Sequence, residues 1–407
     1  MPKKRVNNTG SVYHESGRGY RAQVSLEDGR RVSKRFSDSD LGQQQAYDWL
    51  HEQLHHISKG VFVAPTDITL GEWLLEWLEI YSKQNVRQRT FERYVSLAKH
   101  VNPIAGYRLQ DLKPTHFQKL YVSLGHYSGE TRKKVHNILH AALKQAIHDK
   151  LLPYNPMEGV TPPKVVRKEV ITFSKEEMEA LLGYAKTHRW YPALLLAAHT
   201  GMRLGEVLGL RWQDADFNDR CIYVRQTLQH PSTGIKFEPP KSKASRRKIS
   251  IPEETVATLR EHHRQCMEDL ILRNNPHGLY FTANNGSPIQ PKNFERWWAK
   301  LQLRINDEWQ ELDKQREELL AKKISAKSQE YREIVAKQKV AQEKHHKKFH
   351  AFRHTHATDL LASGENIMDV ARRLGHSKAS TTLDLYGHAI PANDQRIAEK
   401  VGKLYKL

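Results

Sequence analysis

The stretch LGHSKASTTLDLYGH, residues 374–388, decides how the rest of this sequence is understood. Its first part predicts a polar turn over residues 375–380, and the remainder predicts a short helix that carries Tyr386. A tyrosine next to a histidine is ordinarily a packing or surface residue. The stretch alone therefore leaves two alternatives open: Tyr386 belongs to a core, or it attacks a target. The rest of the chain has to separate them.

Upstream, FHAFRHTHATDLLASGENI at residues 349–367 predicts a helix with His350 and Arg353 side by side, because residues three apart share a helix face. Earlier still, TGMRLGE places Arg203 at the start of a helix with Glu206 on the same face. Such an Arg–Glu pair is usually a structural ion pair.

Two strands are predicted between these helices, CIYVRQTL and RRKISIP. The loop that joins them, KFEPPKSKASRR, carries Lys241 and Lys243.

Composition points to a polyanionic partner. The 407 residues favour two or three domains, and 65 Lys and Arg against 46 Asp and Glu give a formal charge of +19. Membrane association is the weaker alternative, because no run of about 18 apolar residues and no signal-peptide pattern is present. We expect a cytoplasmic protein. The two cysteines fit a reducing compartment and exclude both a cysteine-built zinc site and a disulfide framework.

The N-terminal segment predicts a three-stranded sheet with one basic face. Apolar and polar residues alternate in YRAQVSL, and EDGRRVSKRF adds a turn and a further strand. A helix from about Asp40 is expected to cover the apolar face. The opposite face either contacts a groove of DNA or is merely solvated. Its arginines are Arg21, Arg31 and Arg35.

Beyond a linker at residues 59–67 the pattern becomes helical. One apolar stripe repeats at helical spacing from Leu70 to Leu78, and helices are predicted at about 88–100, 113–124 and 129–150. Basic residues at their starts or exposed faces are a second candidate for holding phosphates. They are Arg87, Arg89, Arg93, Lys99, Arg132, Lys133 and Lys134. A proline-rich linker, NPMEGVTPPKVVRKEV, ends this unit, and a capping box at Ser174 opens the next.

Taken in order, these motifs resemble the tyrosine recombinases, specifically the phage- and transposon-type integrases. The resemblance covers about residues 65–407, and residues 10–57 are similar to the arm-site DNA-binding domain of many such integrases. It implies a mainly α fold with small β-sheets (α+β). The expected domains are an arm-site domain (1–60), a helical, SAM-like core-binding domain (65–160) and a mixed α/β catalytic domain (170–407).

The resemblance also implies an active site. Its residues would be Arg203, Lys243, His350, Arg353, His376 and the nucleophile Tyr386. Glu206 would orient Arg203. Lys241 is the alternative to Lys243, which we prefer for its distance to the ISIP strand.

These residue types suit phosphodiester exchange. A phenolic oxygen can hold the 3′-phosphate covalently, and two guanidinium groups can fork onto the charge of a pentacoordinate phosphorus. The lysine is the family's usual proton donor to the leaving 5′-oxygen, His350 suits acid/base work on the tyrosine, and His376 would hydrogen-bond a non-bridging oxygen. No metal ion, other cofactor or ATP is expected.

Two features compete with this interpretation or depart from it. His346, His350 and His354 have a spacing that could hold zinc, but no carboxylate or cysteine partner is evident nearby. Residues at about 303–345 are highly charged and predict a solvated helical hairpin or coiled coil, longer than the usual connection in this family. A spacer is favoured there over a contact to DNA or to a neighbouring subunit.

The expected function is a site-specific DNA recombinase that integrates and excises a mobile element or phage genome. Its partners would be double-stranded DNA with core and arm attachment sites, three further copies in a homotetramer, an excisionase and a host DNA-bending protein. It would act in the cytoplasm of a bacterial host cell, at the nucleoid when active. The alternative is a DNA-binding accessory or regulatory protein without turnover, and the full set from Arg203 to Tyr386 favours the enzyme. The tail from Ile397 predicts a short helix that docks on its own or a neighbouring subunit.

Overall fold

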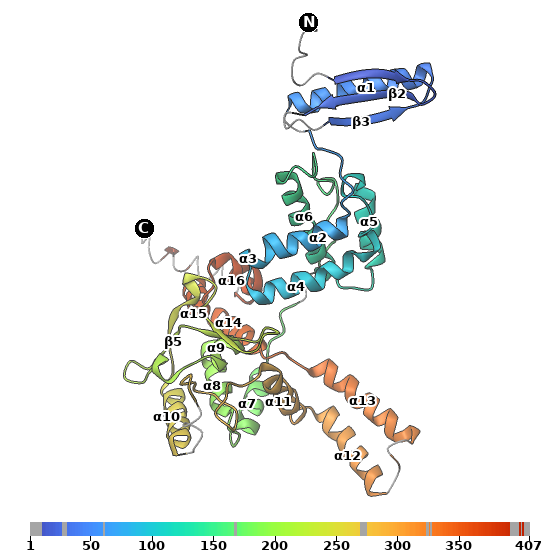
Figure 1. Ribbon diagram of the computed structural model, residues 1–407. Coiled ribbons are helices and arrows are strands. Elements are labelled where there is room, and N and C mark those ends of the chain that lie inside the picture. Colours follow the sequence, from blue (N-terminus) through green and yellow to red (C-terminus); the bar gives the residue numbers. More distant parts are fainter. Residues whose placement is uncertain are drawn as a thin grey trace. The chain divides into compact units, whose positions relative to one another are not determined.

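The structure is a computed structural model, and it describes residues 10–26, 31–59, 62–166, 169–268, 275–322, 325, 328–390, 399 and 401–402. The chain divides into two compact units, residues 1–167 and 168–407. The predicted mainly α fold with small sheets is confirmed (Figure 1). Over the described ranges, every helix is too short or too polar to cross a membrane. The predicted tail helix lies largely outside these ranges.

The first unit begins with a three-stranded antiparallel sheet covered by a helix. The strands β1 (Gly10–Glu15), β2 (Gly19–Ser25) and β3 (Arg31–Phe36) are neighbours in that order, and α1 (Asp40–Ser58) packs on one face. Ala22 and Val24 of β2 meet Ala46 and Leu50 of α1 in a small core. The predicted strand alternation is therefore confirmed.

A second core of the first unit is entirely helical. Its elements are α2 (Leu70–Trp77), the π-helical turn η1 (Leu78–Ser82), α3 (Lys83–Asn85), α4 (Gln88–Ala98), η2 (Lys99–Ile104), η3 (Leu109–Asp111), α5 (Pro114–Ser123) and α6 (Gly129–His148). The predicted stripe of α2 is buried, and the indole of Trp73 donates to the carbonyl of Ala142 at 2.9 Å. Met157 and Val160 belong to this core, so the proline-rich linker begins later than its composition suggests.

The second unit combines helices with two small sheets. Its helices before the sheets are α7 (Lys175–Ala185), α8 (Tyr191–Thr200), α9 (Leu204–Leu208) and η4 (Trp212–Asp214). One sheet has the order β4 (Ala215–Asp216), β5 (Cys221–Val224), β8 (Arg247–Ser250), and the other pairs β6 (Thr227–Gln229) with β7 (Lys236–Glu238). The remaining elements are η5 (Lys243–Ser245), α10 (Glu253–Glu268), α11 (Pro291–Leu303), α12 (Asp307–Ala321), α13 (Gln329–His345), α14 (Ala351–Ala362), α15 (Ile367–Leu374), α16 (Ala379–Tyr386) and η7 (Gly387–Ala389).

The predicted long strand CIYVRQTL is wrong in one respect. The chain leaves the first sheet after Val224, and residues 227–229 pair with β7 instead. The predicted pairing with RRKISIP holds only for β5, where Ile222 lies opposite Ile249. Both isoleucines are buried, so the core fixes this register.

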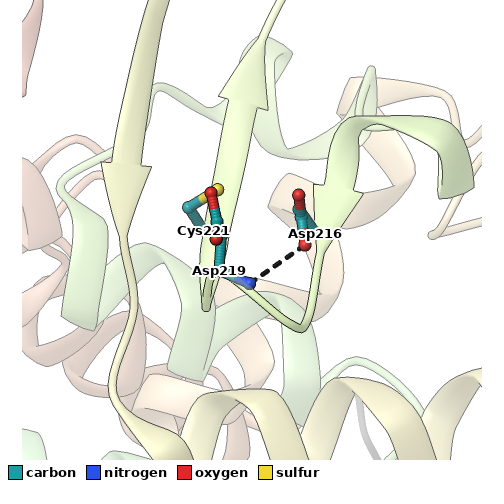
Figure 2. Close-up of side chains that lie close together, drawn as sticks. All are labelled: Asp216, Asp219 and Cys221. Carbon is teal, nitrogen blue, oxygen red and sulfur yellow. Dashed lines mark hydrogen bonds between the residues drawn. The ribbon is translucent and has the colours of Figure 1, made fainter.

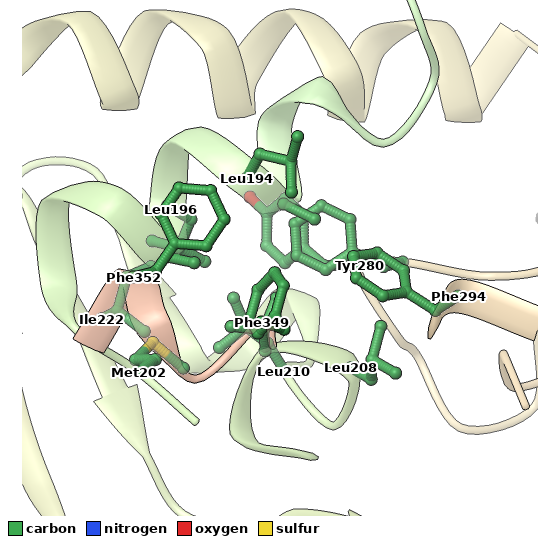
Figure 3. Packing of buried hydrophobic residues seen from close by; sticks show 14 of the residues in the cluster. Leu194, Leu196, Met202, Leu208, Leu210, Ile222, Tyr280, Phe294, Phe349 and Phe352 are labelled. Carbon is green, nitrogen blue, oxygen red and sulfur yellow. The ribbon is translucent and has the colours of Figure 1, made fainter. Parts of the chain in front are cut away.

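The core of the second unit anchors the start of α14. Phe349 and Phe352 lie among side chains from α8, α9 and the first sheet (Figure 3). Phe352 also lies 5.3 Å from Trp298 of α11 between ring centroids. Because these aromatic side chains are buried, the neighbouring His350, Arg353 and His354 are held by a rigid helix start.

Candidate active site

Arg203 is positioned by a tight turn after α8. Gly201 ends that helix with a φ of 62°, and a Cβ there would lie 2.9 Å from the side chains of His356 and Leu374. The turn makes Arg203 the N-cap of α9, where its Nη1 donates to Glu206 Oε1 at 2.9 Å and its backbone N–H donates to Oε2 at 3.0 Å. Glu206 thus orients Arg203, while the Arg203 side chain stays 39% exposed and able to meet a ligand.

A second arginine, Arg247, also contacts the carboxylate of Glu206. It was not among the site residues predicted from the sequence. Its Nη1 and Nη2 donate to the two oxygens of Glu206 at 3.2 and 2.9 Å, and its Nε donates to the carbonyl of Arg373 at 2.7 Å. Both side chains of the pair are 4% exposed. A signal existed: Arg247 lies two residues before the core residue Ile249 on β8, so it shares the strand's buried face and needs a buried partner.

Burial alone raises the pKa of Glu206. Arg247, by charge and hydrogen bonding, and then Arg203 outweigh that effect, so the pKa of Glu206 lies below its ordinary value. The carboxylate is therefore ionised and holds the two guanidinium groups in place.

Arg353 joins two turns of the site. Its Nη1 donates to the carbonyl of Gly201 at 3.0 Å, and its Nη2 donates to the carbonyl of Leu374 at 2.7 Å. These carbonyls end α8 and α15, the helices that precede Arg203 and His376. Burial, then the charge of Arg203, lowers the pKa of Arg353 to about 9. The group remains a cation at neutral pH and has little solvent to screen its charge.

His376 follows the left-handed Gly375, whose φ is 73°, at the end of α15. Its Nδ1 lies 2.8 Å from the hydroxyl of Thr382, which is fully buried on α16. Burial, then Arg353 and Arg203, lowers the pKa of His376 to about 4. His376 is therefore neutral, and its other nitrogen can donate one hydrogen bond if Nδ1 accepts from the threonine.

Tyr386 is the last residue of α16, and it is 1% exposed. Its hydroxyl lies 2.7 Å from Nδ1 of His354. The histidine predicted to act as acid or base on the tyrosine was instead His350. His350 is edge-on to His354, with ring centroids 4.6 Å apart. Burial raises the pKa of Tyr386, and Arg353 and Arg203 partly oppose that shift. Of the two alternatives for Tyr386, the structure confirms that its ring belongs to a core. Its hydroxyl also contacts a histidine, and its attack on a target stays a prediction.

The two candidate lysines lie on the loop between β7 and β8. Lys243 begins η5, and the side chains of both Lys241 and Lys243 are exposed. The hydroxyl of Ser245 donates to the carbonyl of Gly375 at 3.4 Å, so this loop is attached to the turn that carries His376. The choice between Lys243 and Lys241 stays a prediction.

The arrangement suits an anion. Arg203, Arg247 and Arg353 supply three guanidinium groups against the single carboxylate of Glu206. Burial, and after it the repulsion from neighbouring arginines, lowers the pKa values of His376 and Arg353. A phosphate that entered would relieve this repulsion, because the low dielectric strengthens both repulsion and attraction. Next to it lies a phenol that could attack.

The sequence pattern of the Phage integrase family matches residues 172–316 and 310–392. The chain belongs to the phage integrase family. The N-terminal SAM-like domain of phage integrases also matches, at residues 69–125. The two parts of the first match meet at residues 310–316, inside the charged hairpin of this integrase-family chain. The predicted tyrosine recombinase of integrase type is confirmed.

Relatives of this integrase-family chain extend over nearly its whole length. A "Tyrosine recombinase XerC-like" protein of Caldanaerobacter subterraneus is 26% identical over 95% of this chain and 96% of its own. The "Transposase from transposon Tn916" of Enterococcus faecalis is 22% identical over 96% and 94%. Among solved structures, the Tn1549 transposon integrase in complex with circular intermediate DNA covers 83% of this chain and 100% of its own, at 20% identity and a TM-score of 0.62. A lambda integrase tetramer bound to a Holliday junction covers 91% and 96%, at 15% identity and a TM-score of 0.52.

One other cluster has the spacing of metal ligands. Within the described ranges, the only grouping of that kind is Asp216, Asp219 and Cys221 (Figure 2). Oδ1 of Asp216 accepts from the backbone N–H groups of Asn218 and Asp219 at 3.1 and 3.0 Å, and Asp219 pairs with Lys248 at 2.8 Å. These contacts close the turn between β4 and β5.

The helical spacing predicted for the three histidines with zinc-like spacing is wrong at its first step, because His346 lies between α13 and α14. Nδ1 of His346 lies 3.1 Å from Nε2 of Gln302, whereas His354 contacts Tyr386 and the ring of His350.

The predicted DNA-binding residues lie in the first unit. Arg21 and Arg35 face each other across β2 and β3, and both pair with Glu15 of β1, at 3.3 and 3.0 Å. The side chains are exposed at Arg31, Arg35, Arg89, Arg93 and Lys133 and half-buried at Arg21, Arg87 and Arg132. Their contact with DNA stays a prediction.

The charged insertion is a helical hairpin, as predicted. The helices α12 and α13 pack on each other, and Nε2 of Gln338 donates to Oδ1 of Asp313 at 3.0 Å (Figure 1). Leu319, Ile334 and Ala341 form its sparse buried positions.

Proposed function

We propose that this protein is a site-specific DNA integrase that cleaves and rejoins DNA through a 3′-phosphotyrosine intermediate. The observation that carries the proposal is the position of the Tyr386 hydroxyl, which is buried beside a histidine in a site built from three arginines. A protein that only binds DNA has no use for such a phenol. Membership of the phage integrase family supports the same reaction.

In the proposed reaction, Arg203 and Arg353 hold the non-bridging oxygens of the scissile phosphate and His376 donates a further hydrogen bond. Tyr386 attacks the phosphorus, and the 5′-oxygen leaves with a proton from Lys243. The 5′-hydroxyl of a partner strand then attacks the phosphotyrosine and releases the enzyme. The bond energy is kept in the covalent intermediate, so neither ATP nor a cofactor is required. The arginines neutralise the charge of the transition state.

We further propose that the domains divide the work on DNA. Residues 1–60 would bind arm sites, residues 65–160 would bind core sites, and residues 170–407 would catalyse. The basic side chains Arg21, Arg31 and Arg35, and Arg87, Arg89, Arg93, Arg132 and Lys133, would contact phosphates. The match of residues 69–125 to the SAM-like domain supports the middle assignment.

The biological task we propose is integration and excision of a mobile element or phage genome, in the cytoplasm of a bacterial host and at its nucleoid. The active assembly would be a homotetramer on two DNA sites, with an excisionase and a host DNA-bending protein as further partners. The lambda integrase, which shares this fold, has been solved as a tetramer bound to a Holliday junction, and this analogy supports the assembly.

The test is a covalent-trapping experiment. The substrate is a nicked duplex that joins the two ends of the DNA element that encodes the chain, so that cleavage releases a short fragment and traps the adduct. Wild-type protein should form a denaturant-resistant protein–DNA adduct, and Y386F should bind the same duplex without forming it. Equal binding with no adduct from either protein would instead favour an accessory DNA-binding protein.

A further inference from the structure

We infer that His354 takes the proton of Tyr386 during cleavage and returns it during rejoining. This inference rests on the proposed function, because it names the proton acceptor of that same site. The His-x-x-Arg motif of the family consists of His350 and Arg353 in this chain. His354, the next residue, lies outside that motif.

The geometry favours His354 over the other histidines of the site. Its Nδ1 lies 2.7 Å from the hydroxyl of Tyr386, which is within the range for proton transfer along a hydrogen bond. The structure gives Nδ1 of His376 a different partner, the hydroxyl of Thr382. His350 packs its ring edge-on to His354, with no hydrogen bond to Tyr386 over the described residues.

The position of His354 is fixed by its helix. Phe352, two residues earlier, is fully buried in the core, and Arg353 is held by two carbonyl groups. The backbone of His354 therefore cannot move away from Tyr386 without disturbing the core or the arginine. A group held so firmly at the distance of a hydrogen bond is pre-organised for proton transfer.

Burial keeps the imidazole neutral and the phenol protonated, and the neighbouring cations reinforce the first effect and oppose the second. The groups that face His354 are His350 on the same helix, Tyr386 on α16, and the cation Arg353, with His376 also close enough to be affected. Burial, then Arg353, lowers the pKa of His354, whereas burial raises the pKa of Tyr386. A neutral imidazole can accept at Nδ1, and a phenol that stays protonated at neutral pH needs an acceptor before it can attack.

Atoms and charges balance in the proposed step. The O–H bond of Tyr386 breaks and its proton moves to Nδ1 of His354, while the phenolic oxygen forms a bond to phosphorus. The bond from phosphorus to the 5′-oxygen breaks, and that oxygen takes a proton from Lys243. During rejoining, the 5′-hydroxyl of the partner strand gives its proton to the neutral Lys243 amine and its oxygen attacks the phosphorus. The bond from phosphorus to the phenolic oxygen breaks, and His354 returns the proton to that oxygen. The new imidazolium would lie beside the negatively charged oxygens of the pentacoordinate phosphorus, and their charge would stabilise the imidazolium.

His356 provides a matched control on the same helix. It is also a half-buried histidine, and its Nδ1 lies 3.0 Å from the carbonyl of Ala198 while its Nε2 accepts from Nε of Arg373. It has no contact with Tyr386 over the described residues. The variant H356N therefore removes a half-buried imidazole from α14 without removing the partner of the phenol.

The experiment measures single-turnover cleavage of the nicked duplex by the full chain. The variants are H354N, which keeps an acceptor oxygen near the place of Nδ1 but is not a base, and H354F, which keeps the ring. Each is made with tyrosine or with 3-fluorotyrosine at position 386, whose phenol is more acidic. Thermal unfolding and binding of the duplex are measured for every protein, and a variant that fails either is replaced by H354Q.

H354N and H354F should cleave about 100-fold or more slowly than wild type, the loss typical of a missing general base. With 3-fluorotyrosine in place of Tyr386, H354N should cleave at least about 10-fold faster than H354N with tyrosine, because a more acidic phenol depends less on a proton acceptor. H356N should show no such gain. The H354N rate should also rise with pH, whereas the wild-type rate should level off.

Three results would overturn the inference. Cleavage by H354N at the wild-type rate would remove His354 from the reaction while leaving the proposed function intact. A slow H354N without any gain from fluorination would reduce His354 to a positioning residue. If wild-type protein forms no adduct on a duplex that it binds, the proposed function fails, and the inference fails with it.

Discussion

Replacement of Arg247 by methionine should destabilise the second unit severely. The side chain of Arg247 is 4% exposed, and it donates hydrogen bonds to both oxygens of Glu206 and to the carbonyl of Arg373. Removing one partner of a buried ion pair costs about 3–5 kcal/mol, because the remaining charge stays buried. Arg203 still bonds Glu206 in the variant, so we expect the lower part of this range, about 3–4 kcal/mol. R247K keeps the positive charge but not the paired N–H donors of the guanidinium group, and we expect it to lose about half as much free energy of unfolding as R247M.

The measurement is native-state hydrogen exchange of peptides from α8, Tyr191–Thr200, since most of that helix is buried in the core of the second unit. Exchange of these peptides reports the opening of this unit even though the whole chain does not unfold in one step. K248M is the matched control. Lys248 lies next in sequence, but its bond to Asp219 is exposed, so exchange should stay close to wild type.

The loss should depend on pH in a defined direction. The pKa of Glu206 is lower in the folded chain than the unfolded value of about 4.3, so its ion pair stabilises the fold above that pH and the stabilisation is lost as the pH falls below it. Without Arg247, burial raises the pKa of Glu206 again. The difference between wild type and R247M should therefore be largest near neutral pH and shrink in acid. Unchanged exchange in R247M, or a difference that grows in acid, would refute this account of the pair.

Three further predictions concern catalysis and assembly. Y386F should bind DNA as tightly as wild type and form no covalent adduct, since only a hydroxyl is removed; any adduct in Y386F would refute Tyr386 as the nucleophile. K243A should slow cleavage far more than K241A, and a substrate with a 5′-bridging sulfur, which leaves without a proton, should rescue only K243A; rescue of K241A instead would reverse the choice. Deletion of the residues after Asn393, which lie largely outside the described residues, should leave binding of a single site nearly intact and lower recombination of paired sites; full strand exchange by the truncated protein would contradict a role of the tail in assembly.

The order of motifs in the sequence was enough to predict the family, because Arg203, His350, Arg353, His376 and Tyr386 are each marked by a local pattern. A helix start, an i, i+3 pair or a glycine turn identifies such a residue within a few positions. The register of β5 with β8 was predictable for a similar reason, since both strands bury isoleucine.

The contacts between distant segments were not predictable in this way. The bond between His354 and Tyr386 joins residues 32 positions apart, and that between Arg247 and Glu206 joins residues 41 positions apart. Spacing along one helix or strand places a side chain on a face, but it does not say which other element packs against that face. The hairpin of β6 and β7 was not predicted. In the sequence, β6 looks like the end of the preceding strand and β7 looks like part of a loop.

Helix α16 is attached to the site at two points one helical turn apart. Thr382 contacts His376 and Tyr386 contacts His354, so a displacement of the helix breaks both bonds together. Through this helix, Tyr386, the proposed nucleophile, and His376, the residue proposed to bind phosphate, share one support. The two bonds therefore couple the position of the Tyr386 hydroxyl to the support of His376. For a protein that holds DNA ends, as we propose, such coupling would be a safeguard, because a site that bound phosphate without its phenol in place would leave the strand open to attack by water.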